Sequence, residues 1–100
     1  MKYRELGNTG MKVSSIALGS GGISSLEKEV AVPMIHRALE MGVNYIDTAR
    51  GYGIAELNFG IGIKGRRENI YISSKTQATT KEQAWQQLHD GEIDPVLAQC

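Results

Sequence analysis

Hydrophobic and polar residues follow two different periods along this chain, and the changes of period divide it into short strands and helices. The first two strand-like segments are residues 2–6 and 11–15. Residues 7–10, Gly-Asn-Thr-Gly, separate them, and glycine and asparagine both tolerate the positive φ of tight turns. This pattern predicts an N-terminal β-hairpin.

Three later segments are typical of strands: residues 16–18, 43–48 and 70–74. Residues 16–18 form a continuous apolar run, as expected of a strand that is covered on both faces. Residues 70–74 alternate between apolar and polar side chains. Each segment ends in a glycine-rich or polar stretch, so the three strands are short.

A first helix is predicted between the first two of these segments. Residues 24–27, Ser-Ser-Leu-Glu, have the spacing of a capping box, and apolar residues recur at helical spacing over residues 30–41. Pro33 conflicts with this pattern, because a proline inside a helix costs about 3 kcal/mol. We therefore expect a kink at Pro33 or a helix that begins near Val32. Gly42 is expected to end the helix as its C′ residue.

A second helix is predicted over residues 55–64, although Gly60 and Gly62 each cost about 1 kcal/mol relative to alanine. This helix needs tertiary support. A third helix is predicted to begin with a capping box, formed either by Thr79 with Glu82 or by Thr80 with Gln83.

The predicted order is a hairpin followed by β-α-β-α-β-α, in one domain over residues 1–100. Alternation of strands and helices with short connections favours parallel strands covered by helices, an α/β fold. A short ending over residues 94–100 follows the break at Asp90-Gly91 and cannot be classified.

Composition narrows the class of protein. The chain has a formal net charge of zero, 41% hydrophobic residues and 22% charged residues, as is ordinary for a soluble domain. We expect no nucleic-acid or membrane partner.

Cys100 is the only cysteine, which excludes a disulfide framework. The N-terminus lacks the apolar core of a signal peptide, and no run approaches the ~20 residues that span a bilayer. We expect a cytoplasmic protein.

Candidate chemistry lies at the three predicted strand ends, because parallel α/β folds bind ligands beyond the carboxyl ends of their strands. These ends carry the Gly19-Ser20-Gly21 loop, then Asp47 followed by Tyr52, and then Lys75. A lysine ammonium beside a phenol favours the phenolate, and a carboxylate beside the lysine fixes its position. A tyrosine in this setting can donate a proton to a carbonyl oxygen as hydride reaches the carbon. The alternative is that these residues have structural roles only. Asp47 would then cap a turn, Tyr52 would be a packing residue and Lys75 would be a surface charge.

Two other patterns carry less weight. Residues 19–24, Gly-Ser-Gly-Gly-Ile-Ser, are close to the Gly-x-Gly-x-x-Gly phosphate fingerprint but have Ser24 in place of the third glycine. A small Rossmann-like nucleotide binder therefore remains an alternative, although a tight turn is the commoner explanation. His36 and His89 are the two histidines, and they form no cluster, so we predict no metal site.

The stretch of residues 42–60, Gly-Val-Asn-Tyr-Ile-Asp-Thr-Ala-Arg-Gly-Tyr-Gly-Ile-Ala-Glu-Leu-Asn-Phe-Gly, resembles the signature of the aldo-keto reductase family. Tyr-Arg-x-Leu-Gly-x-Thr-Gly-x-x-Val-Ser near the N-terminus and Ile-Ser-Ser-Lys at residues 72–75 are similar to the same family. The resemblance covers about residues 2–85. Ala55 and Gly62 depart from it, since the family usually has serine and alanine there.

The resemblance implies a (β/α)8 TIM barrel whose bottom is closed by the N-terminal hairpin. Such a barrel needs ~250 residues, so this chain holds about three β/α units, a partial barrel. The implied reaction is reversible reduction of a small aldehyde or ketone by NADPH. Tyr52 is then the general acid, tuned by Lys75 and Asp47. Gly19, Ser20, Gly21 and Asp47 match positions at the cofactor.

The end of the chain allows two interpretations. Residues 87–89, Gln-Leu-His, resemble the end of the family's fourth strand, which makes His89 a candidate for the catalytic histidine that orients the substrate. Residues 85–88 also fit the middle of the third helix. We hypothesise that an internal segment is missing and that the chain is incomplete. The alternative function is a non-catalytic module that binds a nucleotide or a protein, with self-association through exposed sheet edges.

Overall fold

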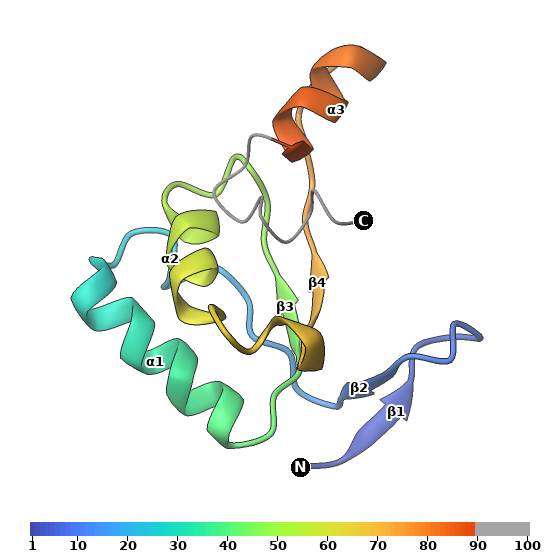
Figure 1. The fold of residues 1–100 in the computed structure, drawn as a ribbon, viewed down its shortest axis with the longest axis vertical. Helices are drawn as coiled ribbons and strands as arrows, with labels where there is room; N and C mark the ends of the chain where they lie inside the picture. Colours follow the sequence, from blue (N-terminus) through green and yellow to red (C-terminus); the bar gives the residue numbers. More distant parts are fainter. Residues whose placement is uncertain (90–100) are drawn as a thin grey trace.

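The computed structural model describes residues 1–89, and the predicted break and ending at residues 90–100 lie outside the described residues (Figure 1). The elements in chain order are β1 (Tyr3–Glu5), β2 (Lys12–Ser14), α1 (Lys28–Glu40), β3 (Tyr45–Asp47), α2 (Ala55–Gly62), a 3-10 turn at Arg67–Asn69, β4 (Tyr71–Ser73) and α3 (Lys81–His89). From α1 onwards the predicted alternation of helices and strands is confirmed, and with it the α/β class. None of the helices in residues 1–89 is long and apolar enough to span a membrane.

The N-terminal hairpin is confirmed and is tied to the start of β3. Strands β1 and β2 pair antiparallel, with Tyr3 opposite Ser14. The Tyr3 hydroxyl donates a hydrogen bond of 2.7 Å to the carbonyl of Gly42. The Asn44 side chain accepts from the Ser14 amide at 2.6 Å and donates to the Lys12 carbonyl at 2.9 Å. These contacts fix the hairpin at the amino ends of the parallel strands (Figure 1).

The parallel sheet consists of β3 and β4, paired with Tyr45 opposite Tyr71. The predicted strand at residues 16–18 is reduced to one parallel bridge, between Leu18 and Ile46. The expectation that this run is covered on both faces is wrong, because Ile16 is 62% exposed. The chain bends here: the Ser14 hydroxyl donates a hydrogen bond of 2.6 Å to the Ile16 carbonyl.

Helix α1 differs from the prediction at its start. It begins at Lys28 after Glu27 and has no side-chain cap, so the capping box at residues 24–27 is wrong. The helix continues through Pro33 and therefore does not begin near Val32. Its end is as predicted, because Gly42 has a φ of 99°. The amides of Gly42 and Val43 return to the carbonyls of Leu39 and Ala38, which is a Schellman motif.

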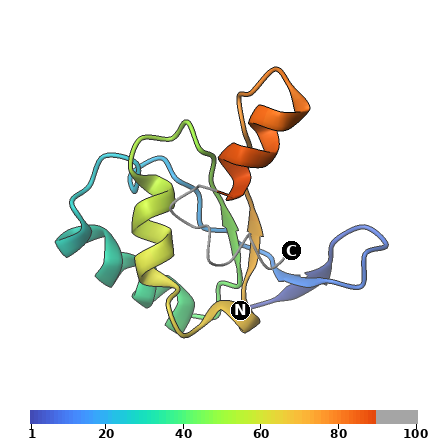
Figure 2. The ribbon, with the colours of Figure 1, turned by 45° about the horizontal axis from the view of Figure 1, so that its top comes forward.

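The core lies between helices α1 and α2 and the β3–β4 pair. Both helices lie on one side of the strands, and α3 lies beyond the carboxyl end of β4 (Figures 1 and 2). The core cluster of buried residues is Ile23, Ala31, Ile35, Ile46, Ala55, Phe59, Ile63 and Ile70. This packing is the tertiary support that α2 needs.

The second and third helices largely follow the sequence pattern. Helix α2 ends at Gly62, two residues before its predicted end. At α3, the Gln83 amide donates a hydrogen bond of 3.2 Å to the Thr80 hydroxyl, so Thr80, from the second predicted pair, is the side-chain cap of the helix. Residues 85–88 lie inside this helix, as one interpretation of the chain's end predicts.

Candidate active site

Asp47 and Lys75 become neighbours because β3 and β4 run parallel and in register. Asp47 is the last residue of β3 and lies opposite Ser73, the last residue of β4. The pairing continues past the strands, with Thr48 donating to the Ser73 carbonyl at 2.8 Å and Arg50 donating to the Lys75 carbonyl at 3.0 Å. The two predicted strand ends therefore meet at one edge, as expected for ligand sites of parallel sheets.

The Lys75 ammonium is held by two acceptors. Its Nζ donates to Asp47 Oδ1 at 2.9 Å and to the Thr48 carbonyl at 2.8 Å. The hydrogen bond to Asp47 raises the pKa of Lys75 above its ordinary value of 10.5, and the negative charge of Asp47 adds to this effect. Both side chains are nearly half exposed, at 48% and 44%, so solvent screens the attraction.

Tyr52 completes the group. Its amide donates to the Ala49 carbonyl at 3.1 Å, and its carbonyl accepts from the Ala55 amide, the first residue of α2, at 2.9 Å. The turn before α2 thus fixes the tyrosine backbone. Lys75 Nζ lies 5.3 Å from the centre of the Tyr52 ring, a distance typical of a cation–π contact. The three predicted catalytic residues Asp47, Tyr52 and Lys75 are brought together.

A pocket of about 460 Å³ opens beside Tyr52. Its lining residues are Ser20, Gly21, Ser24, Gly51, Tyr52 and Gly53. Ser20 is buried, and its hydroxyl donates to the backbone carbonyl of Asp47 at 2.7 Å. Two of the predicted cofactor residues, Ser20 and Gly21, therefore line the same pocket as Tyr52, whereas Gly19 and the Asp47 side chain do not.

This geometry agrees with the comparisons to known proteins. The model of the Aldo/keto reductase family matches residues 15–94. The chain belongs to the aldo-keto reductase family. The uncharacterized oxidoreductase YqkF of Bacillus subtilis is 35% identical over 77 residues, which cover 75% of this chain and 25% of that protein. The L-galactose dehydrogenase of Arabidopsis thaliana is 34% identical over 70 residues, covering 64% of this chain and 22% of that protein.

Solved structures of the family share the fold of this chain. An aldo-keto reductase from Bacillus halodurans, in its holo form, matches with a TM-score of 0.71 and 33% identity, covering 82% of this chain and 28% of that one. The chain thus spans about a quarter of the length of the curated relatives that it matches, 25% and 22% for the two named above.

The structure also tests the phosphate-fingerprint interpretation of the glycine-rich loop at residues 19–24 of this aldo-keto reductase chain. In the phosphate fingerprint, the loop leads directly into a helix whose N-terminus binds the phosphate. Here turns occupy residues 21–25, and α1 begins only at Lys28. The Rossmann-like alternative therefore fails, and the loop instead forms one wall of the pocket beside Tyr52.

Sequence reasoning missed several residues of the site. The Thr48 carbonyl, Ser24, Gly51 and Gly53 all contribute. The sequence did offer one signal for Gly53: a glycine directly after Tyr52 allows a left-handed turn, and Gly53 adopts a φ of 53°. Ser24 had no local signal, since it reaches the pocket through a contact with a distant turn: its carbonyl accepts from the Ile54 amide at 3.1 Å.

His89 is the last residue of α3, and its side chain lies outside what the structure describes. Nothing in the described geometry places it beside Tyr52. In residues 1–89, no group of three or more histidine, cysteine, aspartate or glutamate residues is arranged to hold a metal ion.

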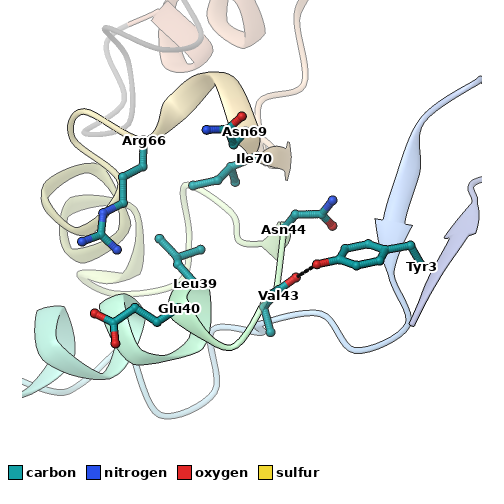
Figure 3. A pocket seen from close by; sticks show the side chains of 9 residues that line it. Tyr3, Leu39, Glu40, Val43, Asn44, Arg66, Asn69 and Ile70 are labelled. Carbon is teal, nitrogen blue, oxygen red and sulfur yellow. Dashed lines mark hydrogen bonds between the residues drawn. The ribbon is translucent and has the colours of Figure 1, made fainter. Parts of the chain in front are cut away.

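A second pocket of about 460 Å³ lies at the opposite, amino end of the parallel strands (Figure 3). It is lined by Tyr3, Leu39, Glu40, Gly42, Val43, Asn44, Arg66, Asn69 and Ile70. The Tyr3 hydroxyl that reaches it is already bonded to the Gly42 carbonyl. None of the residues predicted to be catalytic lines this pocket.

Proposed function

We propose that this chain carries the carbonyl-reducing site of an NADPH-dependent aldo-keto reductase, which reversibly converts a small aldehyde or ketone to an alcohol. Aldo-keto reductases generally use NAD(P)H and small carbonyl substrates, and family membership supports this class of reaction. The observation that carries the proposal is the position of the Lys75 ammonium. It bridges the Asp47 carboxylate and the Tyr52 ring beside a pocket.

The pocket suits the nicotinamide end of the cofactor. Its lining combines two serines with three glycines beside Tyr52. A Cβ atom added at Gly21 would meet no atom within 4 Å, so the backbone there is open to a flat ring. Ser20 and Gly21 would contact the cofactor, which when bound supplies the hydride for the carbonyl carbon.

The remaining chemistry belongs to side chains of this chain. Tyr52, which is 39% exposed, donates its phenolic proton to the carbonyl oxygen as negative charge develops there. The Lys75 ammonium stabilises the anionic tyrosine that remains. Asp47 and the Thr48 carbonyl hold the ammonium in place. In the reverse direction, the tyrosinate accepts the proton of the alcohol.

We place this site in a partial (β/α)8 barrel, and the activity of a whole barrel is part of the proposal. The alternative is a module of the same family that binds NADPH or another protein without turnover. Within residues 1–89, β4 pairs only with β3. Ile54, at the N-cap of α2, and Leu57 and Ile61, within it, are each about 40% exposed. Both features favour association, which sedimentation velocity at increasing concentration would detect.

The test is NADPH-dependent reduction of 4-nitrobenzaldehyde, followed by the loss of NADPH absorbance. We expect turnover by the wild-type chain and a fall of about 10²–10⁴-fold in Tyr52→Phe, which keeps the ring and removes the proton donor. Tyr71→Phe is the matched control, because that tyrosine lies in β4 outside the pocket. Equal rates in the two variants would contradict the role of Tyr52. Cofactor binding without any turnover would favour the binding module.

A further inference from the structure

Glu56 is a buried carboxylate for which the proposed reaction has no role. The residue is only 5% exposed and is the second residue of α2. It lies outside the pocket beside Tyr52. Its Oε1 accepts a hydrogen bond of 2.6 Å from the hydroxyl of Ser74. Burying a carboxylate is costly unless it is well bonded, so this position calls for a specific reason.

The bond joins the two segments that carry Tyr52 and Lys75. On one side, the first amide of α2 holds the Tyr52 carbonyl at 2.9 Å, so that helix start and tyrosine move together. On the other side, Ser74 directly precedes Lys75 in the chain. The Glu56–Ser74 bond therefore connects the backbone near Tyr52, the proposed proton donor, with the backbone next to Lys75.

The backbones of the two segments are also joined directly, because the Arg50 amide donates to the Lys75 carbonyl at 3.0 Å. The side chains of Tyr52 and Lys75 are joined more loosely. The side-chain contact between Lys75 and Tyr52 is a 5.3 Å cation–π contact, which leaves the relative position of ammonium and phenol soft. A charge-assisted hydrogen bond is shorter and stronger than a neutral one. The amino end of α2 further favours a negative charge at Glu56. Together these make the Glu56–Ser74 bond a second link between the two segments, one that ties the start of α2 to the residue before Lys75.

We infer that Glu56 is a positioning residue, which sets the placement of Lys75 against Tyr52 through its hydrogen bond to Ser74. This inference rests on the proposed function for its effect on catalysis. Its structural part, the placement of the Lys75 ammonium, stands separately. A role in stability alone does not require a carboxylate, since replacing both partners of a hydrogen bond by apolar groups of the same shape can be nearly neutral.

The test compares Ser74→Ala, Glu56→Leu and Glu56→Gln in the full chain. Ser74→Ala removes the donor, and Glu56→Leu removes the acceptor at similar volume. Glu56→Gln keeps an oxygen that accepts from Ser74. Ser25→Ala is the matched control, because Ser25 is exposed and remote from Lys75 in the chain. Urea unfolding of each variant separates a loss of stability from a loss of placement.

Two readouts are needed. The first is kcat and KM for NADPH-dependent reduction, where misplacing a catalytic group by about 1 Å costs about 10²-fold. The second is NMR titration of the Lys75 ammonium, assigned by its loss in Lys75→Arg. The titratable groups that act on this ammonium are Asp47, Tyr52 and Tyr45. Release of Lys75 from its place moves its pKa towards the ordinary value of 10.5.

We expect Ser74→Ala and Glu56→Leu to lower kcat by about 10- to 100-fold with little change in KM, and to lower the pKa of Lys75. Glu56→Gln should keep most of the wild-type kcat and most of the raised pKa of Lys75. Wild-type kcat and an unchanged Lys75 titration in folded Ser74→Ala would overturn the inference. If the wild-type chain shows no reduction, the proposed function fails, and the titration still decides on positioning. If Glu56→Leu does not fold, Ser74→Ala, which deletes one oxygen, carries the same decision.

Discussion

At the residue scale, the site depends on how Lys75 is shared among its neighbours. The ammonium uses two of its three protons, one on Asp47 Oδ1 and one on the Thr48 carbonyl. The same Nζ lies 5.3 Å from the centre of the Tyr52 ring. Since both acceptors come from the end of β3, the lysine from the next strand also links the two strand ends. The proposed catalytic placement and the local stability therefore involve the same side chain.

The raised pKa of Lys75 makes part of the stability depend on pH. A raised folded-state pKa means that the contribution is fully present below the ordinary value of 10.5 and is lost as pH rises through the folded-state pKa. The hydrogen bond to Asp47 is its largest cause. We expect the stability difference between wild type and Asp47→Asn to be constant up to about pH 10 and to shrink above it, by no more than about 1 kcal/mol for an exposed pair.

Urea unfolding of both proteins between about pH 8 and about pH 12 measures this difference. Both proteins contain the same other lysines and tyrosines. The titration of those groups therefore cancels in the difference between the two free energies of unfolding. A difference that stays constant over the whole range, or grows with pH, would show that the ion pair does not form in solution.

Gly53 controls the pocket from a single backbone position. Its φ is 53°, and an added Cβ would lie 2.5 Å from the Ser24 carbonyl oxygen. Gly53→Ala therefore combines the strain of a left-handed residue, about 1–2 kcal/mol, with a clash that pushes apart two walls of the pocket. Gly7→Ala is a matched control, because Gly7 has a φ of 56° with no atom within 4 Å of the added Cβ.

We expect Gly53→Ala to lower the free energy of unfolding by more than Gly7→Ala does, and to weaken NADPH binding, which Gly7→Ala leaves unchanged. Chemical denaturation and fluorescence titration with NADPH measure the two effects. Equal stabilities of the two variants would mean that the contact between residues 24 and 53 is loose.

At the element scale, helix α2 depends on packing more than on intrinsic propensity. Gly60 and Gly62 weaken it as an isolated helix, and the sequence pattern alone therefore predicted the need for support. The source of support was not predictable, because it comes from Ile35 on α1. An added Cβ at Gly62 would lie 2.8 Å from the Ile35 Cγ2 atom. Ile35 is fully buried, so a glycine at this crossing lets the two helices approach.

Gly62→Ala therefore sets helix propensity against packing. Propensity favours alanine by about 1 kcal/mol, whereas overpacking a core costs about 1–3 kcal/mol. We expect a net loss of stability in urea unfolding. Ile35→Leu moves the branch away from Cβ at nearly constant volume, so Gly62→Ala should cost less in that background. A gain of stability from Gly62→Ala alone would show that α1 can shift at no cost.

Helix starts illustrate which local signals succeed. Thr80 caps α3 as its spacing with Gln83 predicted, since its hydroxyl accepts a hydrogen bond of 3.2 Å from the Gln83 amide. Ser24 fails as a cap for α1, since its hydroxyl donates to the Gly21 carbonyl at 3.3 Å and its carbonyl accepts from Ile54. A capping box is a local pattern, and a contact with a residue thirty positions later overrides it.

At the scale of the whole molecule, the sequence was sufficient for the strand ends but not for the pocket. Asp47 and Lys75 follow from parallel pairing, which fixes which residues meet once β3 and β4 are in register. The pocket walls at Ser24 and Gly53 depend on how the segment before α1 crosses the turn before α2. That crossing is a long-range contact with no periodic signature.

A ligand-linked stability measurement tests whether the molecule as a whole holds the cofactor. Binding to the folded state at about 100 times Kd stabilises it by about 2.7 kcal/mol, which raises Tm by about 10 °C or more in a domain of this size. We expect NADPH to raise Tm in a saturable manner. Gly21→Asp should abolish the shift, because Gly21 lines the pocket and an acidic side chain would project into it.

Gly22→Asp is the control for that substitution. Both glycines have open space around an added Cβ, so neither aspartate should disturb folding, yet only Gly21 lines the pocket. The two variants carry the same added charge, and hence a difference between them reports contact with the cofactor rather than general repulsion. An equal loss of the shift in both variants would assign it to charge alone. No shift in the wild type would contradict cofactor binding, independently of any turnover by Tyr52.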